Sequence, residues 1–68
     1  MEKEFKISLA AARVNAGLTQ LDVAHELHIN KQTVVNWEKG KTKIGFAQFE
    51  MLCRLYEVPR DYIFLPQS

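Results

Sequence analysis

The amino-acid sequence predicts an all-α fold, a compact bundle of five short helices that forms a single domain over residues 1–68. Three observations predict it. A chain of 68 residues is long enough for one small domain only. Apolar residues recur at helical spacing, and no segment is predicted to be a strand. Residues typical of helix starts and ends follow one another at short intervals. The helices are expected to run from about Ser8 to Ala16, Thr19 to Leu27, Lys31 to Lys39, Phe46 to Tyr56 and Pro59 to Phe64.

Polar residues and glycines mark the ends of the first three helices. Ser8, Thr19 and Asn30 are of the types that accept a hydrogen bond from the first helical turn. Gly17 and Gly40 follow the first and third helices, and glycine readily adopts the left-handed conformation that often ends a helix. These signals predict short helices joined by tight turns.

The fourth predicted helix has a clear inward face. Phe49, Leu52, Cys53 and Tyr56 are spaced at i, i+3, i+4 and i+7 and therefore share one side of the helix. We expect Cys53 to be a buried small hydrophobe. The aromatic side chains expected to lie mainly in the core are Phe46, Phe49, Tyr56, Tyr62 and Phe64.

Composition argues against several classes of protein. Cys53 is the only cysteine, which leaves no disulfide and fits a reducing cytoplasm. His25 and His28 lack the repeated spacing of a zinc site, so we expect no bound metal. No apolar run approaches the roughly 20 residues of a membrane span, and the first ten residues mix acids and bases, unlike a signal peptide. We also find no nucleophile–base pair, and so expect no enzymatic activity, cofactor or small-molecule ligand.

Basic residues gather in one part of the chain. The formal net charge is only +1, from nine Lys and Arg against eight Asp and Glu. Lys31, Lys39, Lys41 and Lys43 nevertheless lie within thirteen residues, and Glu38 is the only acid among them. A nearly neutral protein can therefore present one basic face.

The third predicted helix has two distinct sides. Val34 and Trp37 are three residues apart and are expected to face the core. Glutamine and asparagine can pair with adenine in the major groove, lysine can reach guanine, and a small apolar group suits the thymine methyl. A polar stripe of this kind is, taken alone, more often a solvated surface. The side opposite the core residues is formed by Lys31, Gln32, Val35, Asn36 and Lys39.

The polar stripe lies on the second of two short predicted helices that are joined by a three-residue break. Both helices belong to the segment RVNAGLTQLDVAHELHINKQTVVNWEKGKTK. The arrangement resembles the helix-turn-helix of the lambda repressor and Cro (XRE) family of bacterial and phage transcriptional regulators, over about residues 7–65. The matching landmarks are Arg13, the Gly17–Gln20 entry, Ala24, Leu27, Ile29, Val34, the Trp37–Lys41 exit and the Val58–Tyr62 segment.

The resemblance implies roles for individual residues. Arg13 and Glu38 match a pair that bridges the first and third helices. The residues in base-reading positions are Lys31, Gln32, Val35 and Asn36. The residues expected to bind phosphates are Gln20, Lys39, Lys41, Thr42 and Lys43.

The sequence departs from the family pattern at two places. His28 stands where the turn often has glycine, so we expect a left-handed histidine there. Ile44-Gly45-Phe46 replaces a loop that often contains proline, and Ile44 is expected to be exposed for a partner.

The resemblance implies a cytoplasmic, nucleoid-associated regulator of a phage or mobile-element repressor type, in a bacterial or phage-infected cell. Each domain has one short recognition helix, so we expect a homodimer on palindromic double-stranded operator DNA. Met51 and Leu55 lie beside the core stripe of the fourth helix and suggest an interface there, together with residues 44–46 and 63–66.

The sequence is also compatible with two other functions. The chain could be an antitoxin-type interaction module whose main role is to mask a toxin. It could also be the DNA-binding domain of a longer repressor.

Overall fold

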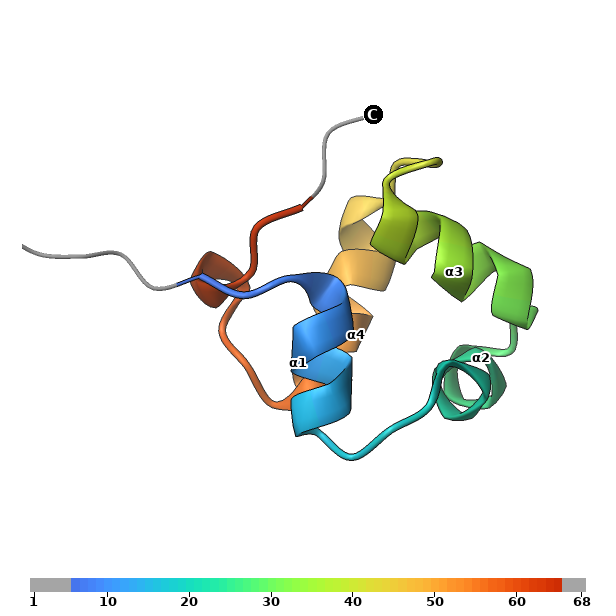
Figure 1. Cartoon of the computed structure of the whole chain (residues 1–68), viewed down its shortest axis with the longest axis horizontal. Coiled ribbons are helices and arrows are strands. Elements are labelled where there is room, and N and C mark those ends of the chain that lie inside the picture. The colour runs from blue at the N-terminus through green and yellow to red at the C-terminus, as the bar shows by residue number, and fades with distance from the viewer. Residues whose placement is uncertain (1–5, 66–68) are drawn as a thin grey trace, which may run out of the picture.

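The computed structural model describes residues 6–65, and four α-helices and one short 3-10 turn form this part of the chain (Figure 1). The described residues contain no sheet, and the all-α fold predicted from the sequence is confirmed. α3 packs against α2, and α1 packs against α4. The elements are α1 (Leu9–Asn15), α2 (Gln20–Leu27), α3 (Lys31–Lys39), α4 (Phe46–Tyr56) and the 3-10 turn η1 (Arg60–Tyr62).

The first three helices begin at the capping residues predicted from the sequence. The Ser8 side chain accepts a hydrogen bond from the first turn of α1. Thr19 and Asp22 form a reciprocal capping box, because each side chain accepts a hydrogen bond from the backbone N–H of the other, at 3.0 and 2.9 Å. The hydrogen bonds from Thr19 lower the pKa of Asp22. Asn30 caps α3 by accepting from the N–H of Thr33.

All four α-helices are closed or followed by a residue with positive φ. Gly17 and Gly40 both have φ of 76°. His28 has φ 58° and ψ 46°, so the left-handed histidine expected at this position is present. Glu57 also adopts this conformation, with φ 56°, at the end of α4. No feature of the sequence distinguished Glu57, because the left-handed region is unfavourable for residues with a Cβ atom.

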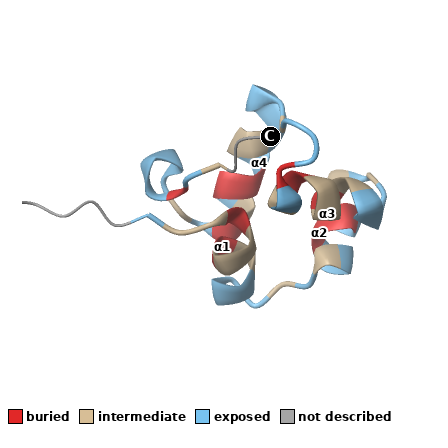
Figure 2. Ribbon diagram, turned by 45° about the horizontal axis from the view of Figure 1, so that its top comes forward, coloured by how far each residue is buried: buried red, intermediate tan, exposed pale blue. Residues whose placement is uncertain are grey.

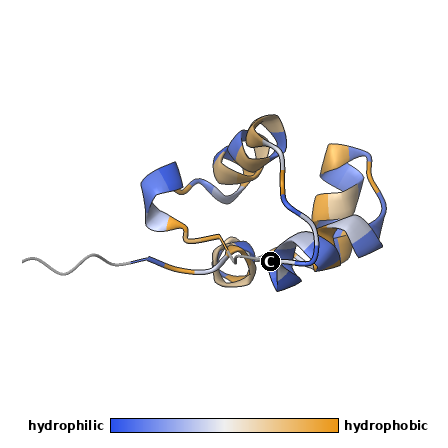
Figure 3. Ribbon diagram, turned by 90° about the horizontal axis from the view of Figure 1, so that it is seen from above, coloured by the Kyte–Doolittle hydropathy of each residue, from blue (hydrophilic) through white to orange (hydrophobic). Residues whose placement is uncertain are grey.

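The core lies where the inward faces of the helices meet (Figure 2). Hydrophobic and hydrophilic residues are interspersed along the ribbon, as expected for amphipathic helices (Figure 3). Cys53 is buried as expected, and burial raises the pKa of its thiol. The buried residues are Leu9, Ala12, Val23, Ala24, Val34, Trp37, Leu52, Cys53, Tyr56 and Ile63.

The predicted fifth helix is a single 3-10 turn of three residues. The segment after it is extended and pairs with the chain before α1. Ile7 donates its N–H to the carbonyl of Tyr62 and accepts from the N–H of Phe64, at 2.8 and 3.1 Å. An isolated parallel bridge thus joins Ile7 and Ile63. A helix cannot continue there because Ile7 occupies these backbone groups.

Three aromatic residues predicted to be in the core are instead exposed, namely Phe46, Tyr62 and Phe64, at 67, 52 and 51%. Phe46 is the first residue of α4 and precedes the inward stripe. Neighbouring side chains alternate along an extended backbone, so burying Ile63 turns Tyr62 and Phe64 outward. Ile44, expected to be exposed, is half-buried against the core.

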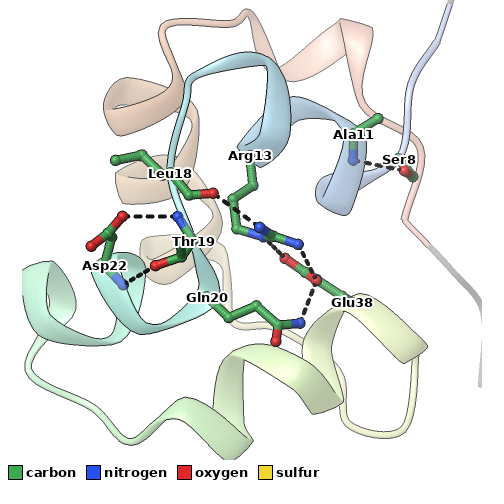
Figure 4. Close-up of polar contacts among 8 residues, drawn as sticks. All are labelled: Ser8, Ala11, Arg13, Leu18, Thr19, Gln20, Asp22 and Glu38. Carbon is green, nitrogen blue, oxygen red and sulfur yellow. Dashed lines mark hydrogen bonds and ion pairs between the residues drawn. The ribbon is translucent and has the colours of Figure 1, made fainter.

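Arg13 and Glu38 form a salt bridge between α1 and α3 (Figure 4). Arg13 Nε lies 2.7 Å from Glu38 Oε2, and their side chains are only 13 and 9% exposed. Arg13 Nη1 also donates to the carbonyl oxygen of Leu18 at 2.9 Å, before α2. Gln20 Nε2 donates to Glu38 Oε1 at 2.9 Å. These contacts hold α1, α2 and α3 together.

The Tyr56 hydroxyl is buried and has no hydrogen-bond partner within the described residues. Burial raises the pKa of Tyr56 to about 12, and the charge of Glu38 contributes to the rise while that of Arg13 opposes it. The folded protein therefore favours the neutral phenol.

Removing one partner of the Arg13–Glu38 bridge should leave a largely buried charge unpaired. We expect Arg13→Met or Glu38→Leu to lower the free energy of unfolding by roughly 2–4 kcal/mol. The double variant should be less harmful than the sum of the two changes. Urea unfolding of the four proteins gives this comparison, and additive losses would show that the side chains do not interact energetically.

Ionisation of Tyr56 should destabilise the fold at alkaline pH. An unfolded tyrosine ionises near pH 10, so the folded state binds more protons between about pH 10 and 12, and stability falls through that window. The loss should be on the order of 2 kcal/mol by pH 12. Tyr56→Phe lacks the ionisable group, so its unfolding free energy should fall less across the same range. Equal slopes for the two proteins would contradict the role of Tyr56.

Candidate nucleic-acid interface

The turn between α2 and α3 is held by backbone hydrogen bonds and by packing. The N–H of Ile29 donates to the carbonyl of Ala24 at 3.0 Å, and the N–H of left-handed His28 also donates to Ala24. Ile29 packs against the core. Ala24 is 2% exposed, and its small side chain lets α3 approach α2 closely. The angle at which α3 leaves α2 is therefore set by the turn and by the packing together.

The outward side of α3 carries the residues predicted to read bases. Lys31 and Gln32 are exposed, while Val35 and Asn36 are half-buried. Val34, on the opposite side, is only 1% exposed and anchors the helix to the core. The structure therefore brings the four predicted base-reading residues together on one face.

Two amides on this face are hydrogen-bonded to each other. Gln32 Nε2 donates to Asn36 Oδ1 at 3.1 Å. The bond was not predicted from the sequence, although the i, i+4 spacing of the two residues permits it. It leaves the Gln32 carbonyl oxygen as an acceptor and the Asn36 amide nitrogen as a donor. The face therefore offers both kinds of hydrogen-bonding group side by side.

Exposed polar residues continue from α3 into the following loop. Lys39 is exposed in the last turn of α3, and Lys41, Thr42 and Lys43 are exposed beyond it. Left-handed Gly40 reverses the chain, and the N–H of Lys41 donates to the carbonyl of Asn36 at 2.9 Å. The loop is thus tied to the last turn of α3, and its positive charges lie next to the face of that helix.

Gln20, the first residue of α2, is placed differently from a freely projecting phosphate ligand. It is half-buried, and its amide nitrogen donates to Glu38 (Figure 4). The sequence offered no sign of this contact, because Gln20 and Glu38 are 18 residues apart. Gln20 therefore joins the Arg13–Glu38 bridge to the start of α2.

Within residues 6–65 no group of three or more His, Cys, Asp or Glu is placed to hold a metal ion. None of their helices is long and apolar enough to cross a membrane.

Comparison with known protein families gives a match. A family model described as helix-turn-helix, of the Cro and XRE type, matches residues 9–63. Searches against curated proteins and solved structures gave no significant match. The matched residues include all four helices, the turn at His28 and the exposed face of α3. The chain therefore belongs to the Cro and XRE-type helix-turn-helix family of DNA-binding, non-enzymatic domains.

Proposed function

We propose that the protein is a sequence-specific transcriptional regulator that binds double-stranded operator DNA with α3 in the major groove. The observation that carries the proposal is the outward face of α3, where Gln32 and Asn36 form a hydrogen-bonded pair next to exposed Lys31. The family binds DNA, and this face supplies chemistry suited to base edges. We further propose that residues 1–68 act as a single domain in a phage or mobile-element repressor.

Specificity is assigned to the N-terminal half of α3. The Gln32 carbonyl oxygen suits the donor of adenine, and the Asn36 amide nitrogen suits its acceptor. Lys31 suits the acceptor atoms of guanine, and Val35 suits a thymine methyl group. We propose these four residues as the base-reading set.

Affinity is assigned to residues around that helix. Lys39, Lys41 and Lys43 are exposed cations, and Thr42 adds a hydroxyl between two of them. Phosphate contacts of this kind bind all sequences alike and weaken with salt. Gln20 completes the set if its amide moves from Glu38 to a phosphate when DNA is bound.

We also propose that the protein binds as a homodimer through the expected interface of residues 44–46, the Met51 and Leu55 side of α4 and residues 63–66. Exposed aromatic side chains are the observation that supports it. Phe46, Tyr62 and Phe64 are each at least half exposed. The Arg60 guanidinium lies over the Phe46 ring, 5.3 Å from its centroid, which joins η1 and the start of α4 into one surface. Ile63 is buried, so it contributes little to this surface, and Pro66 lies outside the described residues.

Base-reading residues and phosphate-binding residues should respond differently to substitution. Gln32→Ala or Asn36→Ala should weaken binding to an operator selected from random DNA by about 1–3 kcal/mol and leave binding to a scrambled duplex nearly unchanged. Lys41→Ala should weaken both and reduce the salt slope by about one unit. Binding isotherms over a salt series measure both quantities.

The fold should be unchanged in all three variants, because none of these side chains belongs to the core, and circular dichroism verifies this. Equal losses on both duplexes for Gln32→Ala and Asn36→Ala would remove α3 as the reading element.

Placing a charge on the aromatic surface should disrupt the dimer. We expect Phe46→Asp to weaken self-association by roughly tenfold or more, because large aromatic residues dominate most interfaces. Val14→Asp is the matched control, since Val14 is 61% exposed but lies on α1 outside this surface. Sedimentation equilibrium measures the association.

Footprinting gives the matching result on DNA. Half-sites should be centred about 10 base pairs apart, which is one helical turn. A single unrepeated half-site occupied by one protein at saturation would refute the homodimer.

A further inference from the structure

The hydroxyl of Tyr56 has no hydrogen-bond partner among residues 6–65, although it is buried. Tyr56 is the last residue of α4 and is only 6% exposed. Buried polar groups are usually hydrogen-bonded, because an unpaired one in the interior destabilises the fold. A phenylalanine would supply the same ring for packing, so packing alone does not account for the hydroxyl.

The charged side chains that act on this phenol are the two members of the Arg13–Glu38 bridge. Burial is the largest cause of the raised pKa of Tyr56, the charge of Glu38 adds to the rise, and that of Arg13 opposes it. Neighbouring charges act in this way only over short distances. The side chains of Arg13 and Glu38 are themselves only 13 and 9% exposed. The hydroxyl therefore keeps its proton at neutral pH and is a potential donor close to an anionic acceptor.

Glu38 has room for a further donor, and one of its present donors is proposed to leave. Its Oε2 accepts from Arg13 Nε at 2.7 Å (Figure 4). Its Oε1 accepts from Gln20 Nε2 at 2.9 Å and from Arg13 Nη2 only at 3.4 Å. A carboxylate offers about four acceptor positions. If Gln20 turns to a phosphate, Oε1 keeps only the long contact.

We propose that Tyr56 is the donor that replaces Gln20 at Glu38 Oε1, which makes it a positioning residue for DNA binding. In the free protein Gln20 binds this oxygen and the Tyr56 hydroxyl is unpaired. When Gln20 binds a phosphate, Tyr56 donates its O–H to Oε1. α4 then supplies the contact that α2 gives up, and α3 keeps its position. This role rests on the proposed DNA-binding function, whereas the exchange of donors can be tested without DNA.

The first test is a double-mutant cycle on the free protein at neutral pH, measured by urea unfolding. Gln20→Met removes the amide donor and keeps the length of the side chain, so it reproduces the departure of Gln20 from Glu38. In the wild-type background, Tyr56→Phe should leave the folded-to-unfolded ratio unchanged or higher, because the hydroxyl is unpaired there. In the Gln20→Met background it should lower that ratio about tenfold, because it removes a hydrogen bond to a charged group.

Cys53→Ala is the matched control for this cycle. Cys53 is also 6% exposed and lies three residues before Tyr56, on the same side of α4. Its substitution should change the folded-to-unfolded ratio by the same factor in both backgrounds. Equal effects of Tyr56→Phe in the two backgrounds would overturn the proposal.

The second test observes the hydroxyl directly. In protein labelled with carbon-13 at tyrosine Cζ, the NMR signal of Tyr56 is identified by its loss in Tyr56→Phe. It should shift in the Gln20→Met variant, whereas the signal of exposed Tyr62 should not. It should also shift when the wild-type protein is saturated with a duplex. A Tyr56 signal that stays in place in both experiments would exclude the exchange of donors.

The third test measures DNA binding. Tyr56→Phe should weaken binding to operator and scrambled duplexes alike, by roughly threefold to tenfold, because Gln20 is proposed to contact a phosphate. In the Gln20→Met background it should leave binding unchanged, because no donor is exchanged there. Equal weakening in both backgrounds would contradict the role of Tyr56. Failure of every duplex to bind would instead reject the proposed function, and the cycle on the free protein would still decide whether the donors exchange.

Discussion

The carboxylate of Glu38 links the three helices on which the interface depends. It accepts from Arg13 of α1 at 2.7 Å and from Gln20 of α2 at 2.9 Å, and it belongs to α3 itself. The same Arg13 side chain reaches the carbonyl of Leu18 before α2. A small domain has few apolar residues with which to fix the angles between helices, and a largely buried charged network adds directional contacts. The outward face of α3 therefore owes its position in part to Arg13 and Glu38, two residues outside the proposed DNA-binding set.

Local signals in the sequence were sufficient to predict most of the helical framework. The caps at Ser8, Thr19 and Asn30 act within one helical turn, so their side chains and their partners are neighbours in the sequence. The periodicity of α4 similarly identified Leu52 and Tyr56 as buried, because an inward face repeats with the helix itself. The pairing of Arg13 with Glu38 came from family resemblance, since no local rule connects residues 25 positions apart.

The features that the sequence did not predict depend on contacts between distant segments. Ile7 forms backbone hydrogen bonds with Tyr62 and Phe64, and these bonds prevent a helix after Tyr62. The segment is extended instead, and Phe64 is exposed. Hydrophobicity alone placed these aromatic residues in the core, yet a domain of this size has little interior for them. The hydrogen bond between Gln32 and Asn36 is local, but its geometry depends on rotamers that propensity does not specify. Sequence thus identified which residues share the candidate interface and left open how their side chains are joined.

The position of Gln20 constrains how DNA binding and folding are coupled. A phosphate near α2 would compete with Glu38 for the Gln20 amide, since both are anionic acceptors. Glu38 keeps its bond to Arg13 Nε when Gln20 leaves, so its charge stays neutralised. Moving the Gln20 amide to a phosphate would break its hydrogen bond to Glu38, a net loss of about 1 kcal/mol. A new hydrogen bond to the charged phosphate can offset this loss. If Gln20 binds a phosphate as proposed, that phosphate lies near Glu38, and without Arg13 the uncompensated carboxylate would repel it. The bridge thus neutralises a largely buried acidic residue that lies next in sequence to the exposed lysines of α3 and the following loop.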